Sequence, residues 1–258
     1  MKIKLKNLWV LLLPVCITYT ACEKSSSLPS NVVTPKTVTS QIALNLTQTL
    51  FGGSGAFDVS GGLSAPSNFA VHTKGKIVND LNSPGCGLVI DTALAYSFTQ
   101  GDTSATVSGS IGFTFNCVNN IVTGFTTSDN MNVTLTTPVL TASAVVAENF
   151  TVLALNPQDD NSTFSINGTV GASSSLKYKS TTSKNGSAAY NYKLTSLIID
   201  PTAEADIVSG SATFTTTGSG GNGTWNYSGT IVFKGNHIAV VTINGTAYTV
   251  NLQTGIVS

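Results

Sequence analysis

The sequence has no arginine and few charges of either sign. All twelve basic residues are lysines, twelve residues are acidic, and charged residues make up 9% of the 258 positions, against roughly 25% in a typical soluble domain. Nucleic-acid binding depends on clustered lysine and arginine side chains that contact phosphates. We therefore expect no nucleic-acid partner, and solubility must come from Thr, Ser and Asn.

Histidine is scarce too, which limits the catalytic chemistry that the chain can perform. No nucleophile motif accompanies either His72 or His237, so His237 is expected to be a hydrogen-bonded residue at the edge of the core. Catalytic sites usually bring several titratable groups together. With so few of them, we expect no enzymatic activity, no metal and no cofactor.

Two acidic clusters are the remaining candidates for site chemistry. The cluster at 159–161, Asp-Asp-Asn, lacks the spacing and the closing glutamate of a helical calcium loop, which favours a solvated turn over a calcium site. Asp200, Glu204 and Asp206 contain enough carboxylates for a glycosidase pair. Their position beside Pro201 instead favours an exposed loop.

Long apolar runs are absent, and the longest candidate lies near the beginning of the chain. Three lysines within the first six residues precede an apolar stretch at 8–17 that Pro14 interrupts. A helix needs about twenty apolar residues to cross a bilayer core of about 30 Å. This shorter pattern is typical of a secretory signal, so residues 1–21 are expected to be a signal peptide.

The end of this segment resembles a bacterial lipoprotein signal, in which a small residue precedes a cysteine that becomes diacylated. Ala21 comes directly before Cys22, whereas a bulky residue precedes Cys16. The resemblance implies acylation at Cys22, for example with palmitate, and a lipid anchor in the outer membrane. Ordinary secretion with cleavage near Ala21 is the alternative. Residues 22–36, rich in Ser and Pro, are expected to be a flexible tether.

A wider resemblance follows from this start and from two stretches near the C-terminus, "GTWNYSGTIVFKGN" and "VTINGTAYTVNLQTG". Together they resemble uncharacterised lipid-anchored envelope lipoproteins of Bacteroidetes, which bring no known activity. In such proteins a surface-export signal usually places acidic residues after a lysine near the cysteine. Here serines follow Lys24, so the cell surface and the periplasmic face of the membrane both stay open.

One hairpin can be aligned residue by residue from its turn. Apolar and polar residues alternate in 86–100 and in 105–117, and Gly-Asp at 101–102 suits a two-residue turn. Folding there pairs residues whose numbers sum to 203, which brings the two apolar faces together and sets Cys86 opposite Cys117. In an oxidising compartment these cysteines are expected to form a disulfide, with Cα atoms about 5.5 Å apart.

Further turns and strands follow from local patterns. Asn-Gly occurs at 167, 185, 222 and 244, each near β-branched or aromatic runs, and predicts hairpins. At the last of these, Val241 would face Tyr248. The run "HIAVVTI", 237–243, predicts a central strand covered on both sides. A change of phase after Leu194 predicts a bulge near Thr195.

The fold class expected from these patterns is all-β. A helix is predicted at about 38–51, because its apolar residues share one face, namely Ile42, Ala43, Leu46 and Leu50. Residues 52–85 are expected to be loop with short strands, and 86–258 an antiparallel meander of ten or eleven strands. The meander would close as a barrel, a curled sheet or a sandwich. A single domain would then cover 37–258.

These expectations favour a non-enzymatic module that presents a Thr/Ser/Asn-rich sheet face or loops to a glycan or to another envelope protein. A carrier with an apolar interior for a lipid or similar ligand is the main alternative, and a carbohydrate-active hydrolase a remote one. Asp-Thr-Ala at 91–93 resembles the short O-glycosylation motif of these bacteria, although Thr92 falls on the inward parity.

Overall fold

The computed structural model describes residues 32–51, 72–73, 76–77, 86, 89–159, 162–181, 184–201 and 205–258. Within them lie one helix, α2 (Pro35–Leu50), and a small sheet of β1 (His72–Thr73) and β2 (Lys76–Ile77). A second sheet has ten strands: β3 (Val89–Gln100), β4 (Thr103–Val118), β5 (Ile121–Thr136), β6 (Leu140–Ala154), β7 (Phe164–Tyr178), β8 (Gly186–Asp200), β9 (Asp206–Gly220), β10 (Gly223–Gly235), β11 (Ile238–Ile243) and β12 (Thr246–Asn251).

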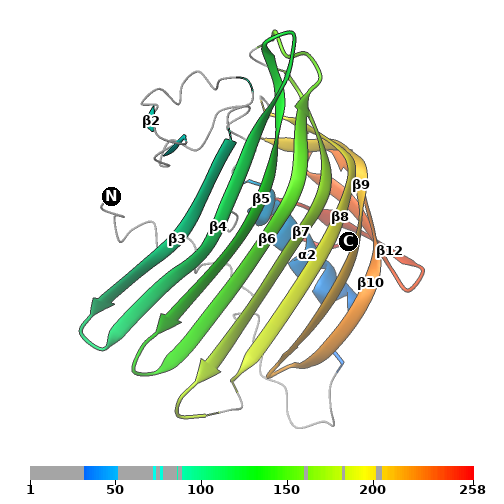
Figure 1. Cartoon of the computed structure of the whole chain (residues 1–258). Coiled ribbons are helices and arrows are strands. Elements are labelled where there is room, and N and C mark those ends of the chain that lie inside the picture. Colours follow the sequence, from blue (N-terminus) through cyan, green and yellow to red (C-terminus); the bar gives the residue numbers. More distant parts are fainter. Residues whose placement is uncertain are drawn as a thin grey trace.

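The large sheet is the predicted antiparallel meander. Each strand pairs with its neighbour in sequence, so the spatial order from β12 to β3 is the reverse of the chain order. The sheet stays open, with β3 and β12 as its edges, and it curls around α2 (Figure 1). Of the three expected forms of closure, the curled sheet is therefore the one observed.

The turns alternate between two ends of this sheet. The β3–β4, β5–β6, β7–β8 and β9–β10 turns lie at one end, which we call the lower end. The β4–β5, β6–β7, β8–β9 and β10–β11 connections lie at the upper end (Figure 1).

The register predicted for the first hairpin is confirmed. Pairs run without a shift from Gln100↔Thr103 to Val89↔Thr114, and every pair sums to 203. A two-residue turn fixes which residues face each other, and the long apolar alternation leaves no competing register.

Two finer predictions about the later strands are also confirmed. Val241 pairs with Tyr248 across the turn at 244–245. The register between β8 and β9 shifts between Thr195 and Ile198, where Ser196 has a φ of 48°.

The Asn-Gly prediction is wrong at Asn167, although Asn185 and Asn222 do lie in turns. Asn167 is inside β7, at a bulge where the register with β8 shifts. Its side-chain Oδ1 accepts a hydrogen bond from the Ser196 backbone N at 2.8 Å, so the bulges of the two strands support each other. Apolar residues continue on both sides of the bulge, and their burial keeps the strand going.

The prediction for 237–243 is wrong about the number of covered faces. Ala239, Val241 and Ile243 are buried, but Val240 and Thr242 on the opposite side are partly exposed. The reason is that α2 lies against the inner face of the curled sheet (Figure 1) and leaves the outer face open.

The predicted helix is confirmed, and it begins a few residues earlier than expected. Pro35 occupies the first turn, where its missing N–H costs nothing, and the Thr34 Oγ1 accepts a hydrogen bond from the Thr37 N at 3.4 Å. Before the helix, Val32 bridges to Thr224 of β10. Residues 32–36, at the end of the segment expected to be a tether, thus pack as part of the domain.

The core lies between α2 and the inner face of the sheet. The four predicted helix residues are buried, together with large sheet side chains such as Phe125, Phe150 and Ile166. Burying each such side chain stabilises the fold by about 1.5–3 kcal/mol. The Tyr192 hydroxyl donates to the Ile42 carbonyl at 3.0 Å, which fastens the helix to the sheet. Burial raises the pKa of Tyr192 well above its ordinary value.

Candidate functional site

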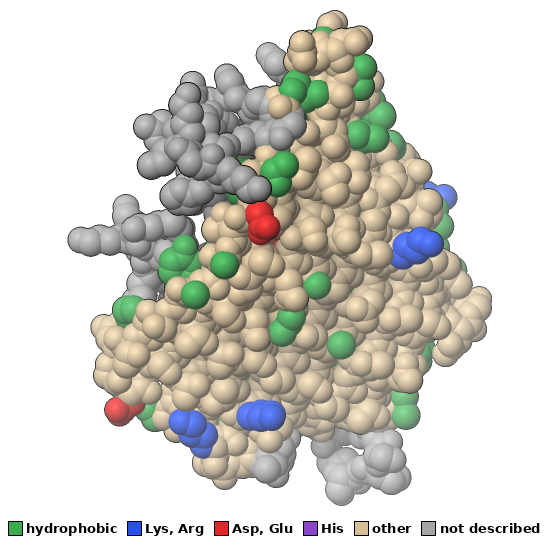
Figure 2. Space-filling model, in the orientation of Figure 1, with side chains coloured by type: hydrophobic (Ala, Val, Ile, Leu, Met, Phe, Trp, Pro, Cys, Tyr) green, Lys and Arg blue, Asp and Glu red, His purple; other side chains and the backbone are tan. Residues whose placement is uncertain are grey.

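The outer face of the sheet, which points away from α2, consists mainly of uncharged polar side chains. Figure 2 shows this face with few charged side chains and scattered apolar ones. The alternation of the strands explains it, because the positions between the buried residues are mostly Ser, Thr and Asn. The face is broad, because most of its strands are 12 to 16 residues long.

Two ladders, made mostly of these side chains, cross the middle of the outer face from β5 to β10. Each ladder consists of residues that pair directly from strand to strand. The first ladder is Ser128, Asn149, Thr169, Lys193, Thr213 and Thr230. The second ladder is Asn130, Ala147, Gly171, Asn191, Thr215 and Ser228. Within a ladder, side chains repeat at the strand spacing of about 4.8 Å.

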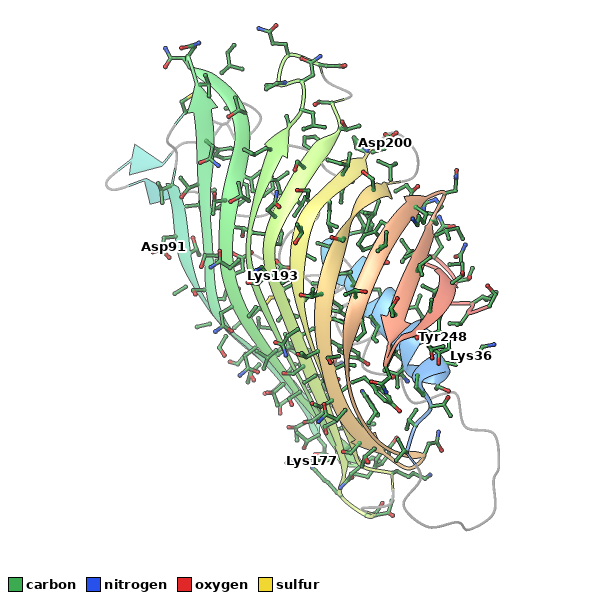
Figure 3. All side chains as sticks on the ribbon, turned by 90° about the vertical axis from the view of Figure 1, so that its right-hand side faces the viewer. Lys36, Asp91, Lys177, Lys193, Asp200 and Tyr248 are labelled. Atoms are coloured by element: carbon green, nitrogen blue, oxygen red, sulfur yellow. A yellow bond between two sulfur atoms is a disulfide. The ribbon has the colours of Figure 1, made fainter. Side chains whose placement is uncertain are left out.

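A groove of about 840 Å³ runs between the two ladders, across the strands. The wall formed by the second ladder has its smallest residues at Ala147 and Gly171, which lie side by side on β6 and β7. A Cβ at Gly171 would come within 3.3 Å of the Asn191 Oδ1, so a larger residue there would displace that side chain slightly. Lys193 is the one cationic side chain among the described residues that line this groove, and Figure 3 shows it midway along the strands.

A second, smaller groove of about 620 Å³ lies nearer the lower end, on β8, β9 and β10. Outward-facing side chains line it, among them Thr217, Ser219 and Asn226. Behind it the ring of Trp225 packs against Gly218, where any Cβ would collide with the ring. The indole Nε1–H donates to the Thr216 Oγ1 at 3.0 Å.

Hydrogen bonds join some neighbouring side chains of the outer face outside the two ladders. The Thr126 and Thr151 hydroxyls lie 3.2 Å apart, and those of Ser143 and Ser175 lie 2.8 Å apart. Each pair joins two adjacent strands. A surface with its side chains already held in place loses less conformational entropy when it binds a ligand.

Directly behind the groove, on the inner face, two carboxyl groups lie side by side. Asp129 of β5 pairs with Glu148 of β6, and their side chains are only 5% and 2% exposed. The Asp129 carboxylate accepts hydrogen bonds from the Thr127 hydroxyl at 2.7 Å and from the Gly112 N at 3.1 Å. Burial raises the pKa of Asp129, against the opposing effect of these hydrogen bonds and of one with Glu148.

This carboxyl pair was not among the residues expected from the sequence, although the sequence carries a signal for it. Asp129 has the same parity as Met131 and Val133, and Glu148 the same parity as Phe150. An acidic residue on the apolar parity of a strand must be buried, and buried acids occur where they are paired or hydrogen-bonded.

The structure groups His237 with Asp206 and Gln253. The Asp206 Oδ1 accepts a hydrogen bond from the His237 backbone N at 3.0 Å and lies 3.4 Å from its Nδ1. The His237 Nε2 is 3.2 Å from the Gln253 Nε2. The Leu252 N also donates to the His237 carbonyl at 2.7 Å. This group ties the start of β9 to the β10–β11 turn and to the C-terminal segment.

The expectation of an exposed loop at the second acidic cluster is wrong for Asp206, which is 4% exposed. Its carboxylate is buried because it holds the β10–β11 turn, where Asn236 and His237 both have positive φ. Asp200 ends β8 opposite Asp206 and is half-buried. Glu204 lies outside the described residues.

The remaining candidates from the sequence are scattered. Asp159 is exposed in the β6–β7 loop, while 160–161 lie outside the described residues. Thr92 is half-buried. His72 is in β1, but its side chain is not described, and Cys22 also lies outside the described residues. Among the side chains that the structure describes, no three His, Cys, Asp or Glu residues come together as metal ligands.

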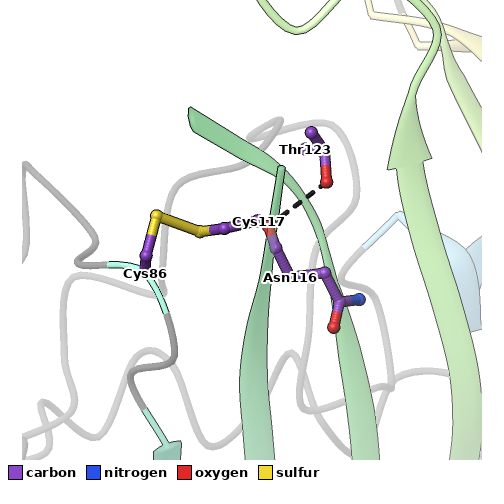
Figure 4. The surroundings of a disulfide bond; sticks show 4 residues. All are labelled: Cys86, Asn116, Cys117 and Thr123. Carbon is purple, nitrogen blue, oxygen red and sulfur yellow. Dashed lines mark hydrogen bonds between the residues drawn. A yellow bond between two sulfur atoms is a disulfide. The ribbon is translucent and has the colours of Figure 1, made fainter. Parts of the chain in front are cut away.

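Cys86 and Cys117 are joined as a disulfide, with their Cα atoms 5.5 Å apart (Figure 4). The bond lies just beyond the last β3–β4 pair and fastens the beginning of the meander to the end of β4. Beside it, the Thr123 hydroxyl donates to the Asn116 carbonyl at 3.3 Å, next to a register shift in β4. The disulfide thus lies at the upper end, away from the groove.

Fold and site together define an all-β protein, an open antiparallel meander curled around one helix with an uncharged polar outer face. Comparison of the chain with protein-family models, with curated proteins and with solved structures gives no match. In the described part of the chain, no helix has the length and apolar character needed to cross a membrane.

Proposed function

We propose that the chain is a lipid-anchored protein of the cell envelope that binds a polysaccharide along the groove of its outer face. The observation that carries this proposal is the pair of polar ladders on both sides of a groove of about 840 Å³. The membrane location is inferred from the resemblance of the segment around Cys22 to a lipoprotein signal.

The chemistry of the ladders suits a polymer rich in hydroxyl groups. Asn amides both donate and accept hydrogen bonds, and Thr and Ser hydroxyls do the same. The ladders offer such groups at about 4.8 Å intervals, so an extended sugar chain lying across the strands would find partners along its whole length. Lys193 apart, the ladder side chains are uncharged, so neutral sugar hydroxyls can cover them without leaving a charge desolvated and unpaired.

The main core supports this proposal over the carrier alternative. A carrier needs a hollow apolar interior, whereas α2 and large side chains such as Phe125, Ile166 and Leu197 pack together in the main core. The hydrolase alternative gains nothing from Asp129 and Glu148, because both carboxyl groups point to the inner face, away from the groove.

Removal of the groove amides tests the proposal. Asn130, Asn149 and Asn191 line the groove, and Asn132, two residues from Asn130 on the same strand and face, does not. We expect Asn130→Ala, Asn149→Ala and Asn191→Ala each to weaken binding about five- to tenfold, the effect of losing about one hydrogen bond. The measurement is retention of the protein on columns of immobilised envelope polysaccharides from the organism that makes it.

Asn132→Ala is the matched control, and it should bind as the unchanged protein does. Equal retention of all four variants would place the ligand elsewhere on the protein. Absence of retention on every polysaccharide would contradict the proposed function itself.

A further inference from the structure

The lower end of the sheet carries a group of cations beside an exposed apolar residue. Lys177, Lys179 and Lys184 are exposed at the β7–β8 turn, and Figure 3 shows Lys177 at the lower end and Asp200 at the upper end. Asp102, at the far β3–β4 turn, is the acidic side chain described at this end. The lower end is thus positively charged around β7 and β8.

The β5–β6 turn adds the apolar residue. Val139 is 55% exposed, and its carbonyl accepts a hydrogen bond from the Lys179 N at 2.9 Å. The two turns are therefore held together. The Tyr178 N donates to the Asn185 Oδ1 at 2.7 Å, and the Lys184 Nζ lies 6.0 Å from the centre of the Tyr178 ring.

The first described residue, Val32, also lies at the lower end. Val32 pairs with Thr224, two residues after the β9–β10 turn. Val32 comes only ten positions after Cys22, and a segment of that length reaches at most about 36 Å. A lipid anchor at Cys22 would hold the lower end close to the bilayer.

We propose that the β5–β6 and β7–β8 turns bind the surface of an anionic lipid bilayer. Lys177, Lys179 and Lys184 contact headgroup phosphates, while Val139 enters the headgroup layer and Tyr178 lies at its boundary. Lysines near an anionic membrane are attracted to it, and tyrosines favour the interface. The sheet then stands on the membrane, with the outer groove parallel to the surface. The proposal depends on the lipid anchor of the proposed function, which brings the protein to a membrane. It does not depend on glycan binding.

Lysine acetylation in the presence of vesicles tests this orientation, with mass spectrometry to measure each site. The full protein is mixed with vesicles of phosphatidylcholine, or of equal parts phosphatidylcholine and phosphatidylglycerol. On the mixed vesicles, we expect Lys177, Lys179 and Lys184 to react about fivefold more slowly, as the attraction per lysine implies. Lys193 and Lys234, away from the lower end, are internal controls and should react at unchanged rates.

The proposal would be overturned if the three lysines reacted equally fast on the two kinds of vesicle. This holds whether they are unprotected or equally protected on both, because in either case the effect does not depend on lipid charge. Val139→Asp should restore the reaction of the three lysines on mixed vesicles, and unchanged protection in this variant would contradict the role of the turn. Flotation with neutral vesicles reports the acyl anchor separately. A protein that does not float with them lacks the anchor, yet its lysines still test the charged surface on mixed vesicles.

Discussion

Phe150 and Asn149 are neighbours on β6, yet they face opposite environments. Phe150 is 2% exposed and packs in the core, whereas Asn149 is exposed in the wall of the groove. The inner face of the sheet depends on shape and volume, because close-packed side chains leave no space for change. The outer face depends on hydrogen-bonding groups at regular spacing and tolerates changes of size. We therefore expect the inner face to contribute most of the folding stability and the outer face to carry the proposed binding.

The largest effect is expected from truncating Phe150. Phe150→Ala should destabilise the protein by about 3–5 kcal/mol, because it removes buried apolar surface and leaves a cavity. Asn149→Ala, one residue away, should change the free energy of unfolding by no more than about 0.5 kcal/mol. Urea denaturation of both variants measures the difference. Similar losses would show that the two faces do not divide stability as proposed.

Loss of the disulfide should have the next largest effect. Cys86 and Cys117 are 31 residues apart in sequence, and a loop of that size corresponds to about 3–4 kcal/mol through restriction of the unfolded chain. The double replacement by Ala should lower stability by this amount in denaturation without reductant. Binding at the groove should be unchanged, because the bond lies at the upper end. A loss of binding in the folded variant would link the two regions.

The carboxyl pair should make stability depend on pH. Burial raises the pKa of Asp129 in the folded protein above that of the unfolded chain, so the folded state binds more protons in the interval between the two pKa values. The contribution of Asp129 to stability should therefore be fully present below the unfolded pKa of about 3.8 and be lost as pH rises through the folded pKa.

The variant Asp129→Asn should flatten this decline, because the amide cannot ionise. Asp102→Asn, at an exposed turn, is the control and should keep the dependence of the unchanged protein. Denaturation at a series of pH values measures the slopes. A slope that Asp129→Asn leaves intact would assign the pH dependence to other groups.

The sequence alone predicted much of this architecture where local geometry decides. The turn at 101–102 set a register that holds along the whole hairpin, and Leu194 marked the bulge of β8. It failed where a neighbouring strand decides. Asn167 forms a bulge because Ser196 lies opposite, a contact that no local pattern contains.

The groove could not be predicted for the same reason. Its walls combine residues of six strands, and most of them are Ser, Thr or Asn residues that look ordinary one at a time. The Thr/Ser/Asn-rich face was expected from composition. The position of Asn149 across the groove from Asn130 and Asn191 depends on the register of every strand pair between them. The burial of Asp129 and Glu148, in contrast, could have been predicted from the sequence, because it follows from the parity of each residue within its strand.

The smallest effect is expected from a single contact within the outer face. Thr126 and Thr151 form a cross-strand pair with their hydroxyls 3.2 Å apart, and such pairs contribute roughly 0.2–1 kcal/mol. Thr126→Val and Thr151→Val keep the shape and β-propensity of the side chain but remove its hydroxyl. A double-mutant cycle should give a coupling of about 0.5 kcal/mol, because each single variant already loses the shared hydrogen bond. A coupling of several kcal/mol would mean that the outer face contributes to stability as the core does, and the division of roles between the two faces would fail.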